Sequence, residues 1–276
     1  MNTEGSSAEK ALRVGIAGLG AIGKAVAERL IQGMPGLRLS AIATRSTAAA
    51  EQFLGERRAR ATLTDLAGLP PLCDVIVEAL PASAFDAVAE PALRAGRTLV
   101  VISVGALLTR PGLEEVAARH GGRIVVPTGA LLGLDAVQAA AQGEIHSVRM
   151  VTRKPPRGLA GAPYIVAHKI SLDGLGAPLK VFEGTARDAV VGFPANVNVV
   201  AALSLAGIGP DRTVIEIWAD PALERNHHAI SVDSDSASFS MEIANIPSEN
   251  PKTGRITALS VIAALSKLQA PISVGT

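Results

Sequence analysis

The apolar positions follow two different patterns along the chain. In the first half, short apolar runs such as Val14 to Ala17, Leu39 to Thr44 and Asp74 to Leu80 are separated by stretches with helical spacing. Further runs follow at 98–103 and 123–126. Strands that alternate with helices are typical of an α/β protein with a doubly wound parallel sheet. The first half is therefore predicted to be a Rossmann-type domain.

The pattern changes from about residue 131. Segments at 147–153, 213–219, 229–233 and 238–243 alternate apolar and polar residues with period two. Such alternation indicates strands that bury one face and expose the other. We expect a second, α+β catalytic domain with a mostly antiparallel, open-faced sheet. An exposed sheet has edges and a face that need covering, so a homodimer formed through it is expected.

The change between these two patterns predicts the domain boundaries. A mobile tail over 1–11 precedes a dinucleotide-binding domain over 12–130. The substrate, catalytic and dimerisation domain covers 131–252. The last apolar helix, over 253–270, is expected to return to the dinucleotide-binding domain.

The first apolar run leads directly into a glycine turn. Gly18, Gly20 and Gly23 follow the order G-x-G-x-x-G, and helical spacing begins after them. Strand, glycine turn and helix in this order form a dinucleotide site, in which the helix N-terminus holds the pyrophosphate. The predicted cofactor contacts of this turn are Gly18, Gly20, Ala21, Ile22 and Gly23. The alternative is a glycine-rich turn without a ligand.

The end of the second strand bears on the choice of cofactor. NAD sites usually carry an acidic residue about 20 positions beyond the glycines, which binds the ribose 2′-hydroxyl. Thr44 and Arg45 stand there instead. A guanidinium with neighbouring hydroxyls can bind a 2′-phosphate in bidentate fashion. We therefore expect NAD or NADP as cofactor, with NADP tolerated or preferred, unless Arg45 is only a solvated loop residue.

Small residues mark the ends of two later strands in this half. Ligands of doubly wound sheets lie at the carboxyl ends of the strands, so these corners should line the nicotinamide half of the crevice. The residues concerned are Ala79, Leu80, Pro81, Ser103 and Gly105.

Composition excludes several classes of partner. The 276 residues have a net charge of +1 and only 3% aromatic residues, which argues against nucleic acid and acidic membranes. The single cysteine, Cys73, excludes an internal disulfide and a cysteine-rich zinc site, and no other metal cluster is expected. A lone buried thiol and a polar N-terminus without an apolar segment fit a cytoplasmic protein.

Two groups of polar residues could carry chemistry. His227 and His228 begin a predicted strand, where neighbouring side chains point to opposite faces. An imidazole titrates near neutrality and suits a general acid or base, although a polar strand start is the alternative. Asn196 and Asn198 interrupt an apolar run after Pro194. Buried amides need partners, so they should bind backbone or ligand, unless Asn196 only caps a helix.

Motifs distributed over nearly the whole chain resemble those of the L-aspartate dehydrogenase family. The most specific are the Phe-Pro-x-Asn-x-Asn and Arg-Asn-x-His elements. In order, the matching segments are 18–23, 103–107, 128–130, 133–135, 153–156, 182–187, 193–199, 220–221, 225–228, 250–253 and 271–276.

The resemblance implies oxidative deamination of L-aspartate to iminoaspartate, then oxaloacetate and ammonia, with NAD(P) as hydride acceptor. It implies His228 as the general acid or base, with Ala130 and Asn198 as cofactor contacts. Supply of iminoaspartate to NAD biosynthesis and catabolism of aspartate both fit the family. Some relatives carry an acidic residue where Thr44 and Arg45 stand, so strict use of NAD is in doubt.

The substrate carboxylates need cationic or N–H partners. By position alone, the candidate substrate residues are Lys154, Asn196, Arg225 and Lys252, and each cation is alternatively a surface charge.

Two other functions compete with this one. The first is another Rossmann oxidoreductase, of homoserine-dehydrogenase or dihydrodipicolinate-reductase type. The second is a non-catalytic NADP-sensing module, against which the intact Arg225-Asn-x-His228 element argues.

Overall fold

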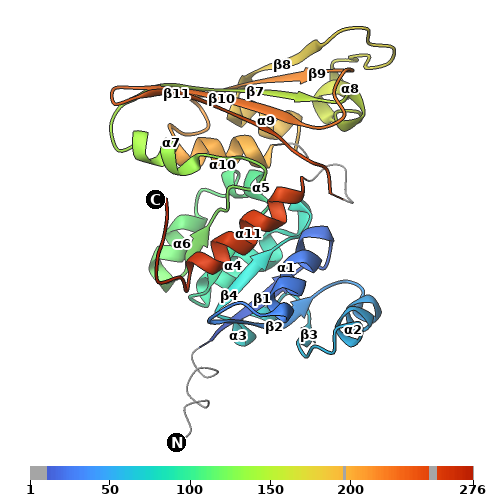
Figure 1. The fold of residues 1–276 in the computed structure, drawn as a ribbon, viewed down its shortest axis with the longest axis vertical. Helices are drawn as coiled ribbons and strands as arrows, with labels where there is room; N and C mark the ends of the chain where they lie inside the picture. The colour runs from blue at the N-terminus through green and yellow to red at the C-terminus, as the bar shows by residue number, and fades with distance from the viewer. Residues whose placement is uncertain (1–10, 195–196, 249–253, 276) are drawn as a thin grey trace, which may run out of the picture. The chain divides into compact units, whose positions relative to one another are not determined.

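The computed structural model describes residues 11–194, 197–248 and 254–275. The chain divides into two compact units, drawn in Figure 1. The first comprises 11–127 together with 258–273, and the second comprises 128–257 together with 274–275. Among the described residues, no helix is both long and apolar enough to span a membrane.

The first unit is built on a six-stranded parallel sheet with the order β3-β2-β1-β4-β5-β6. This is the strand order of dinucleotide-binding doubly wound folds, so the predicted Rossmann-type sheet is confirmed. The strands are β1 (Leu12–Ala17), β2 (Leu37–Ala43), β3 (Thr62–Thr64), β4 (Val75–Glu78), β5 (Thr98–Val101) and β6 (Arg123–Val125). The sequence pattern did not predict β3, which has only three residues.

The helices of this unit pack through apolar faces. In α1 the buried residues are Gly23, Val26, Ala27 and Leu30, at the spacing of one helical face. The elements are α1 (Ala21–Gln32), α2 (Thr47–Glu56), α3 (Leu69–Leu72), η1 (Ala82–Ala84), α4 (Asp86–Arg94), α5 (Val104–Leu108) and α6 (Leu113–His120).

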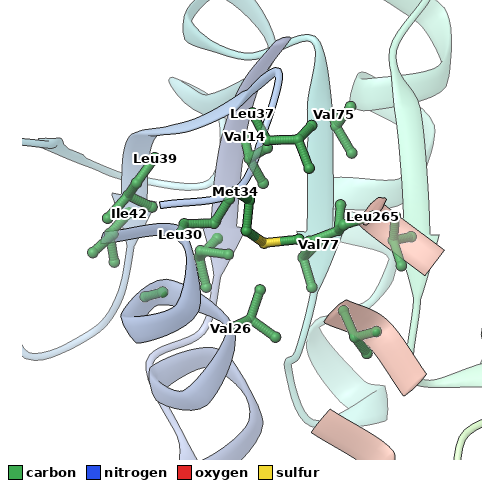
Figure 2. Close-up of a cluster of buried hydrophobic side chains, with 14 of the residues drawn as sticks. Val14, Val26, Leu30, Met34, Leu37, Leu39, Ile42, Val75, Val77 and Leu265 are labelled. Carbon is green, nitrogen blue, oxygen red and sulfur yellow. The ribbon is translucent and has the colours of Figure 1, made fainter. Parts of the chain in front are cut away.

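The last helix, α11 (Arg255–Lys267), adds two residues to the core of the first unit. Val261 and Leu265 are fully buried in the cluster that also contains Leu30 and Val77 (Figure 2). Burial of a leucine or valine side chain contributes about 1.5–3 kcal/mol, so this segment stabilises the dinucleotide-binding unit from the far end of the chain.

The second unit contains a five-stranded sheet with the order β11-β10-β7-β9-β8. The strands are β7 (Ile145–Lys154), β8 (Leu179–Thr185), β9 (Thr213–Ala219), β10 (His227–Ser234) and β11 (Ser238–Ala244). β7 and β9 run parallel, and the other neighbours are antiparallel. The mostly antiparallel prediction holds, and the sheet is mixed because the long connection from β7 to β9 forms a parallel crossover.

One face of this sheet is covered by helices (Figure 1). Along β7, residues Val148, Met150, Thr152 and Lys154 are buried, whereas Arg149 on the opposite face is exposed. The elements of this unit are α7 (Leu134–Ala140), η2 (Pro156–Gly158), α8 (Pro163–Ala167), α9 (Ala186–Gly192) and α10 (Asn198–Ala206). The helix α10 begins at Asn198, four positions after Pro194.

Candidate functional site

The glycine turn of the first unit has the geometry that a dinucleotide requires. Gly18 has a φ of +96°, and a Cβ there would lie 2.5 Å from the carbonyl oxygen of Ala79. A Cβ on Gly23 would collide with the carbonyl oxygen of Gly18. Both positions therefore exclude larger residues, which keeps the turn close to the ends of β1 and β4. The Gly18 N–H donates to the Ala43 carbonyl at 2.8 Å, so the end of β2 lies beside the turn as well.

The N-terminus of α1 is free to receive an anion. Gly20 is the N-cap and offers no side-chain acceptor to the first turn. Gly20 and Ala21 are exposed, and nothing lies within 4 Å of the position that a Cβ on Gly20 would occupy. The N–H groups and the helix dipole can bind a pyrophosphate there. Ile22 is half-buried in the same turn.

The end of β2 carries the residues that were predicted to select the cofactor. Thr44 is half-buried and Arg45 is exposed. Ser46 caps α2 through a hydrogen bond from the Ala49 N–H at 3.4 Å, and its own N–H donates to Thr44 Oγ1 at 3.4 Å. This segment therefore presents a guanidinium and hydroxyl groups at a helix N-terminus.

A buried carboxylate connects the loops at the carboxyl ends of β4 and β5. Glu78, the last residue of β4, has no exposed surface. Its Oε1 accepts from the Leu80 N–H at 2.9 Å, and its Oε2 accepts from the N–H groups of Ile102 at 3.1 Å and Ser103 at 2.9 Å. Ser103 Oγ lies 3.0 Å from Oε1 and also donates to the Leu80 carbonyl at 3.0 Å. Glu78 thus ties the loop after β4 to the loop after β5.

Burial raises the pKa of Glu78, although the four hydrogen bonds oppose this effect. The five sequence-predicted residues at this edge have different environments. Ala79 and Leu80 are half-buried and Pro81 is exposed, whereas Ser103 and Gly105 are buried. The Ser103 hydroxyl is engaged inside the protein, so its role at this edge includes holding the two loops together.

His228 lies in the second unit, on the covered face of the sheet. Its side chain is 2% exposed, while His227 on the opposite face is half-buried. In the register of β10 and β7, His228 stands opposite Thr152, and His228 Nδ1 lies 3.1 Å from Thr152 Oγ1. A hydroxyl can donate or accept, so this contact is compatible with either neutral tautomer. In both cases Nε2 is the nitrogen that can act on a substrate.

Burial is also the main influence on the protonation of this histidine. Burial of the imidazole away from water, followed by the charges of Lys154 and His227, lowers the pKa of His228 to about 3. Lys154 is itself only 4% exposed, and burial lowers the pKa of its ammonium group to about 8. The structure therefore brings together two of the sequence-predicted residues, His228 and Lys154, and Lys154 is not the surface charge that its alternative allowed.

Two other predicted residues of this unit are exposed rather than buried. Arg225 is exposed in the turn before β10, and Asn198 is exposed as the first residue of α10. The interpretation of Asn198 as a buried amide is wrong, because Asn198 is exposed as the first residue of α10. Asn196 and Lys252 lie outside the described residues.

Asn245 was not recognised as a candidate from the sequence. It follows β11, is 4% exposed, and its Nδ2 donates to the carbonyl oxygen of Ala130 at 2.9 Å. Ala130 is half-buried and is one of the predicted cofactor contacts. No spacing or motif links residues 115 positions apart, so only the fold reveals that Asn245 holds the Ala130 segment.

The described residues contain no group of three or more His, Cys, Asp or Glu side chains that could hold a metal ion. Cys73 is fully buried, as predicted, and burial raises the pKa of its thiol to about 11. A thiol in this state is a poor nucleophile.

Comparisons with known proteins divide the chain in the same way as its two sheets. Residues 18–127 match the family described as "Homoserine dehydrogenase, NAD binding domain". Residues 135–268 match the family described as "Aspartate dehydrogenase, C-terminal". The second match favours aspartate dehydrogenase over a homoserine-dehydrogenase-type enzyme, because the first match covers only the cofactor-binding half.

Similar proteins were found among curated sequences and solved structures. The chain is 57% identical to an L-aspartate dehydrogenase of Bradyrhizobium diazoefficiens, covering 98% of this chain and 96% of the relative. It is 52% identical to L-aspartate dehydrogenase 3 of Bordetella bronchiseptica, covering 98% of this chain and 100% of the relative. The crystal structure of aspartate dehydrogenase from Thermotoga maritima superposes with a TM-score of 0.74 at 25% identity, covering 96% of this chain and 99% of that one.

The Rossmann sheet, the glycine turn and the NAD-binding match define a pyridine-nucleotide-dependent dehydrogenase. The relatives over its full length then specify which one: the chain belongs to the L-aspartate dehydrogenase family.

Proposed function

We infer that this protein catalyses the NAD(P)-dependent oxidative deamination of L-aspartate, and the reverse reductive amination of oxaloacetate. In the forward direction, the bound cofactor would accept the hydride of Cα, and loss of this hydride turns the neutral amine into the protonated imine of iminoaspartate. Water then adds to the imine carbon, and ammonia departs to leave oxaloacetate. The full-length identity to curated L-aspartate dehydrogenases is the observation that supports this substrate.

The residues of the first unit fit a dinucleotide. Gly18, Gly20 and the first turn of α1 would hold the pyrophosphate through backbone N–H groups. The bound cofactor supplies the hydride acceptor. The loops after β4 and β5, fixed by Glu78, provide a rigid edge at the carboxyl ends of the strands, where ligands of this fold bind.

His228 is assigned to the proton transfers of the hydrolytic step. As a base, Nε2 takes a proton from the attacking water, and the resulting imidazolium returns a proton to the departing amine. The Thr152 hydroxyl at 3.1 Å supports both forms, since it can donate to Nδ1 or accept from it. This contact is the single observation in the structure that carries the assignment.

The experiment is a steady-state assay of His228→Ala with L-aspartate. We expect turnover to fall about 10²–10⁴-fold, the usual contribution of a general acid or base. His227→Ala is the matched control, because it removes the adjacent imidazole from the opposite face and should retain most activity. Retention of more than about half of the wild-type turnover by His228→Ala would overturn the assignment.

The exposed guanidinium of Arg45 and the N-terminus of α2 support the use of NADP beside NAD. Arg45→Ala should lower kcat/KM for NADP about tenfold and leave the value for NAD within about twofold, as expected for loss of one charge-assisted contact. Arg60→Ala, an exposed arginine after α2, is the control. Equal losses with both cofactors would remove Arg45 from the 2′-phosphate site.

The outer face of the second sheet supports a homodimer. Trp218 lies there beneath the Arg153 guanidinium, 4.9 Å from its ring centroid, and Arg149 pairs with Glu216 and Glu183. A face that mixes apolar surface with both charges can pair with a copy of itself. The molar mass from light scattering tests this.

A cytoplasmic location accords with the buried thiol of Cys73, and cell fractionation tests it. A place in NAD biosynthesis accords with the reaction, and rescue of an auxotroph tests it.

A further inference from the structure

The segment over 128–135 leads into α7 and contains Ala130, the cofactor contact that the family resemblance implies. Two of its residues, Gly129 and Gly133, have φ values of +64° and +63°, which residues with a side chain rarely adopt. Glycine gives the chain more conformational freedom than any other residue, so the path of this segment depends on what it packs against. Leu131 is buried and anchors the segment at one point. Further contacts must fix the rest.

Two contacts from β11 and the residue after it hold the 128–135 segment. Asn245 Nδ2 donates to the Ala130 carbonyl at 2.9 Å. Gly133 lies against Met241, because a Cβ at this glycine would collide with the Met241 sulfur atom. Met241 stands opposite Ile230, which is fully buried, so its side chain points to the covered face of the sheet. The turn at Gly133 is therefore packed tightly against β11.

A third contact comes from the residues that follow α11. Gly275 lies against Asp135, which is exposed in the first turn of α7. A Cβ on Gly275 would lie 2.8 Å from Asp135 Oδ2, closer than such atoms approach in folded proteins, and Gly275 has a φ of +79°. Space and backbone conformation thus each exclude a side chain at this position. The two residues lie in the motif segments 133–135 and 271–276, to which the proposed function assigns no role.

We propose that Gly275 and Asp135 are positioning residues, which fix the 128–135 segment so that Ala130 is in place for the nicotinamide cofactor. The proposal rests on the proposed function and on Ala130 as a cofactor contact. It adds a requirement that the glycine turn of the first unit does not contain, because both residues belong to the second unit.

The packing at Gly133 explains how a contact at Asp135 can act on Ala130. The turn at Gly133 lies between these two residues, and a free glycine turn would absorb any displacement of the start of α7. Met241 occupies the space into which this turn would have to move. A displacement at Asp135 is therefore passed on towards Ala130, because packed side chains transmit strain.

The exposure of the contact argues against a purely structural role. Gly275 and Asp135 are both exposed, so their contact removes little apolar surface from water and contributes little to the free energy of unfolding. A contact that stabilises the fold so little, and still excludes every side chain at Gly275, is explained by the position that it imposes on Asp135.

The test measures the Kd of NADH or NADPH by calorimetry, with the cofactor that wild type binds more tightly. Gly275→Ala places a methyl group against the Asp135 carboxylate, and we expect the Kd to rise about fivefold, a loss comparable to that of one hydrogen bond. Gly174→Ala is the matched control. Gly174 is also exposed and has a φ of +66°, but nothing lies within 4 Å of its Cβ position. This variant has similar backbone strain without the collision and should keep the Kd within about 1.5-fold of wild type.

A double-variant cycle tests whether Asp135 is the partner of Gly275. Asp135→Ala removes the carboxylate and should itself raise the Kd about fivefold. In that background, the methyl group of Gly275→Ala no longer meets the carboxylate, so it should raise the Kd by less than about 1.5-fold. Effects of the two substitutions that simply multiply would overturn the proposal.

Two further measurements separate positioning from stabilisation. The urea midpoint of Gly275→Ala should equal that of Gly174→Ala, and steady-state kinetics should show a raised KM for the cofactor with kcat within about twofold of wild type. An unchanged Kd in Gly275→Ala, or a urea midpoint well below that of Gly174→Ala, would overturn the proposal. Wild type that binds the cofactor but fails to oxidise aspartate would instead overturn the proposed function, and the Kd values would still test Gly275.

Discussion

Glu78 in the first unit and His228 in the second are both almost completely buried, yet their surroundings differ. Glu78 is surrounded by four hydrogen-bond donors, three of them backbone N–H groups. His228 is held at Nδ1 by the Thr152 hydroxyl, which can either donate or accept, and its neighbour Lys154 carries a positive charge. A group enclosed by fixed donors serves the framework, whereas a group held at one atom by a reversible partner is available for chemistry. Burial alone does not distinguish the two.

The largest effect is expected where the framework group is removed. Glu78→Ala leaves the N–H groups of Leu80, Ile102 and Ser103 buried without their acceptor. Each such donor costs about 1–3 kcal/mol, so we expect the free energy of unfolding to fall by about 4 kcal/mol. Urea denaturation measures this. Glu90→Ala, an exposed glutamate paired with Arg94 on α4, should cost less than about 0.5 kcal/mol. A loss below about 1 kcal/mol for Glu78→Ala would remove its framework role.

The sequence was informative where periodicity decides the structure. The apolar runs and the glycine turn predicted the parallel sheet, and period two predicted the strands β7, β9, β10 and β11. The same alternation, read from Val148 through Met150 and Thr152, places Lys154 on the covered face. By position alone, however, Lys154 was indistinguishable from an exposed cation at a strand end.

Other features depend on contacts that no local pattern encodes. Glu78 ends an apolar strand, and two of its three backbone donors come from a loop 24 and 25 residues further on. Asn245 binds a carbonyl group 115 positions earlier. The strand β8 and the helix α9 were not predicted, because Thr185, which caps α9 through the Asp188 N–H, separates segments of only seven residues each. Segments this short carry too few periods to be assigned.

Lowering the pH is expected to have an intermediate effect on the free energy of unfolding, and this effect tests the surroundings of His228. The pKa of His228 is about 3 in the folded protein against 6.5 for a free imidazole. Between these values the unfolded chain binds a proton that the folded protein does not. The stabilising contribution of the neutral histidine is therefore present above pH 6.5 and is lost progressively as the pH falls towards 3.

The measurement is urea unfolding of wild type and His228→Gln at two pH values. Relative to the variant, wild type should lose about 2 kcal/mol between about pH 6.5 and about pH 4.5. The comparison with the variant cancels the titration of the carboxylates that both proteins share. His227→Gln should keep the wild-type slope. Identical slopes for wild type and His228→Gln would show that His228 is not held neutral by burial.

The smallest effect on stability is expected at Asn245. The surroundings of this side chain are intermediate in kind between those of Glu78 and those of His228. Its Nδ2 binds the Ala130 carbonyl, but its buried Oδ1 has no hydrogen-bond partner among the described residues. Asn245→Leu removes one hydrogen bond and one buried polar atom without a partner, and these changes oppose each other. The free energy of unfolding should therefore change by less than about 1 kcal/mol, in contrast to Glu78→Ala.

The functional consequence should nevertheless be measurable, because Asn245 binds the carbonyl group of Ala130, a predicted cofactor contact. Loss of one hydrogen bond of about 1 kcal/mol at this segment should raise KM for the cofactor about fivefold and leave kcat nearly unchanged. Ser240→Ala, an exposed position on β11, is the control. If KM for the cofactor is unaffected while stability falls by several kcal/mol, Asn245 belongs with Glu78 as a framework group. A raised KM at unchanged stability instead shows that a buried polar side chain far from the motifs can serve the site through a single carbonyl contact.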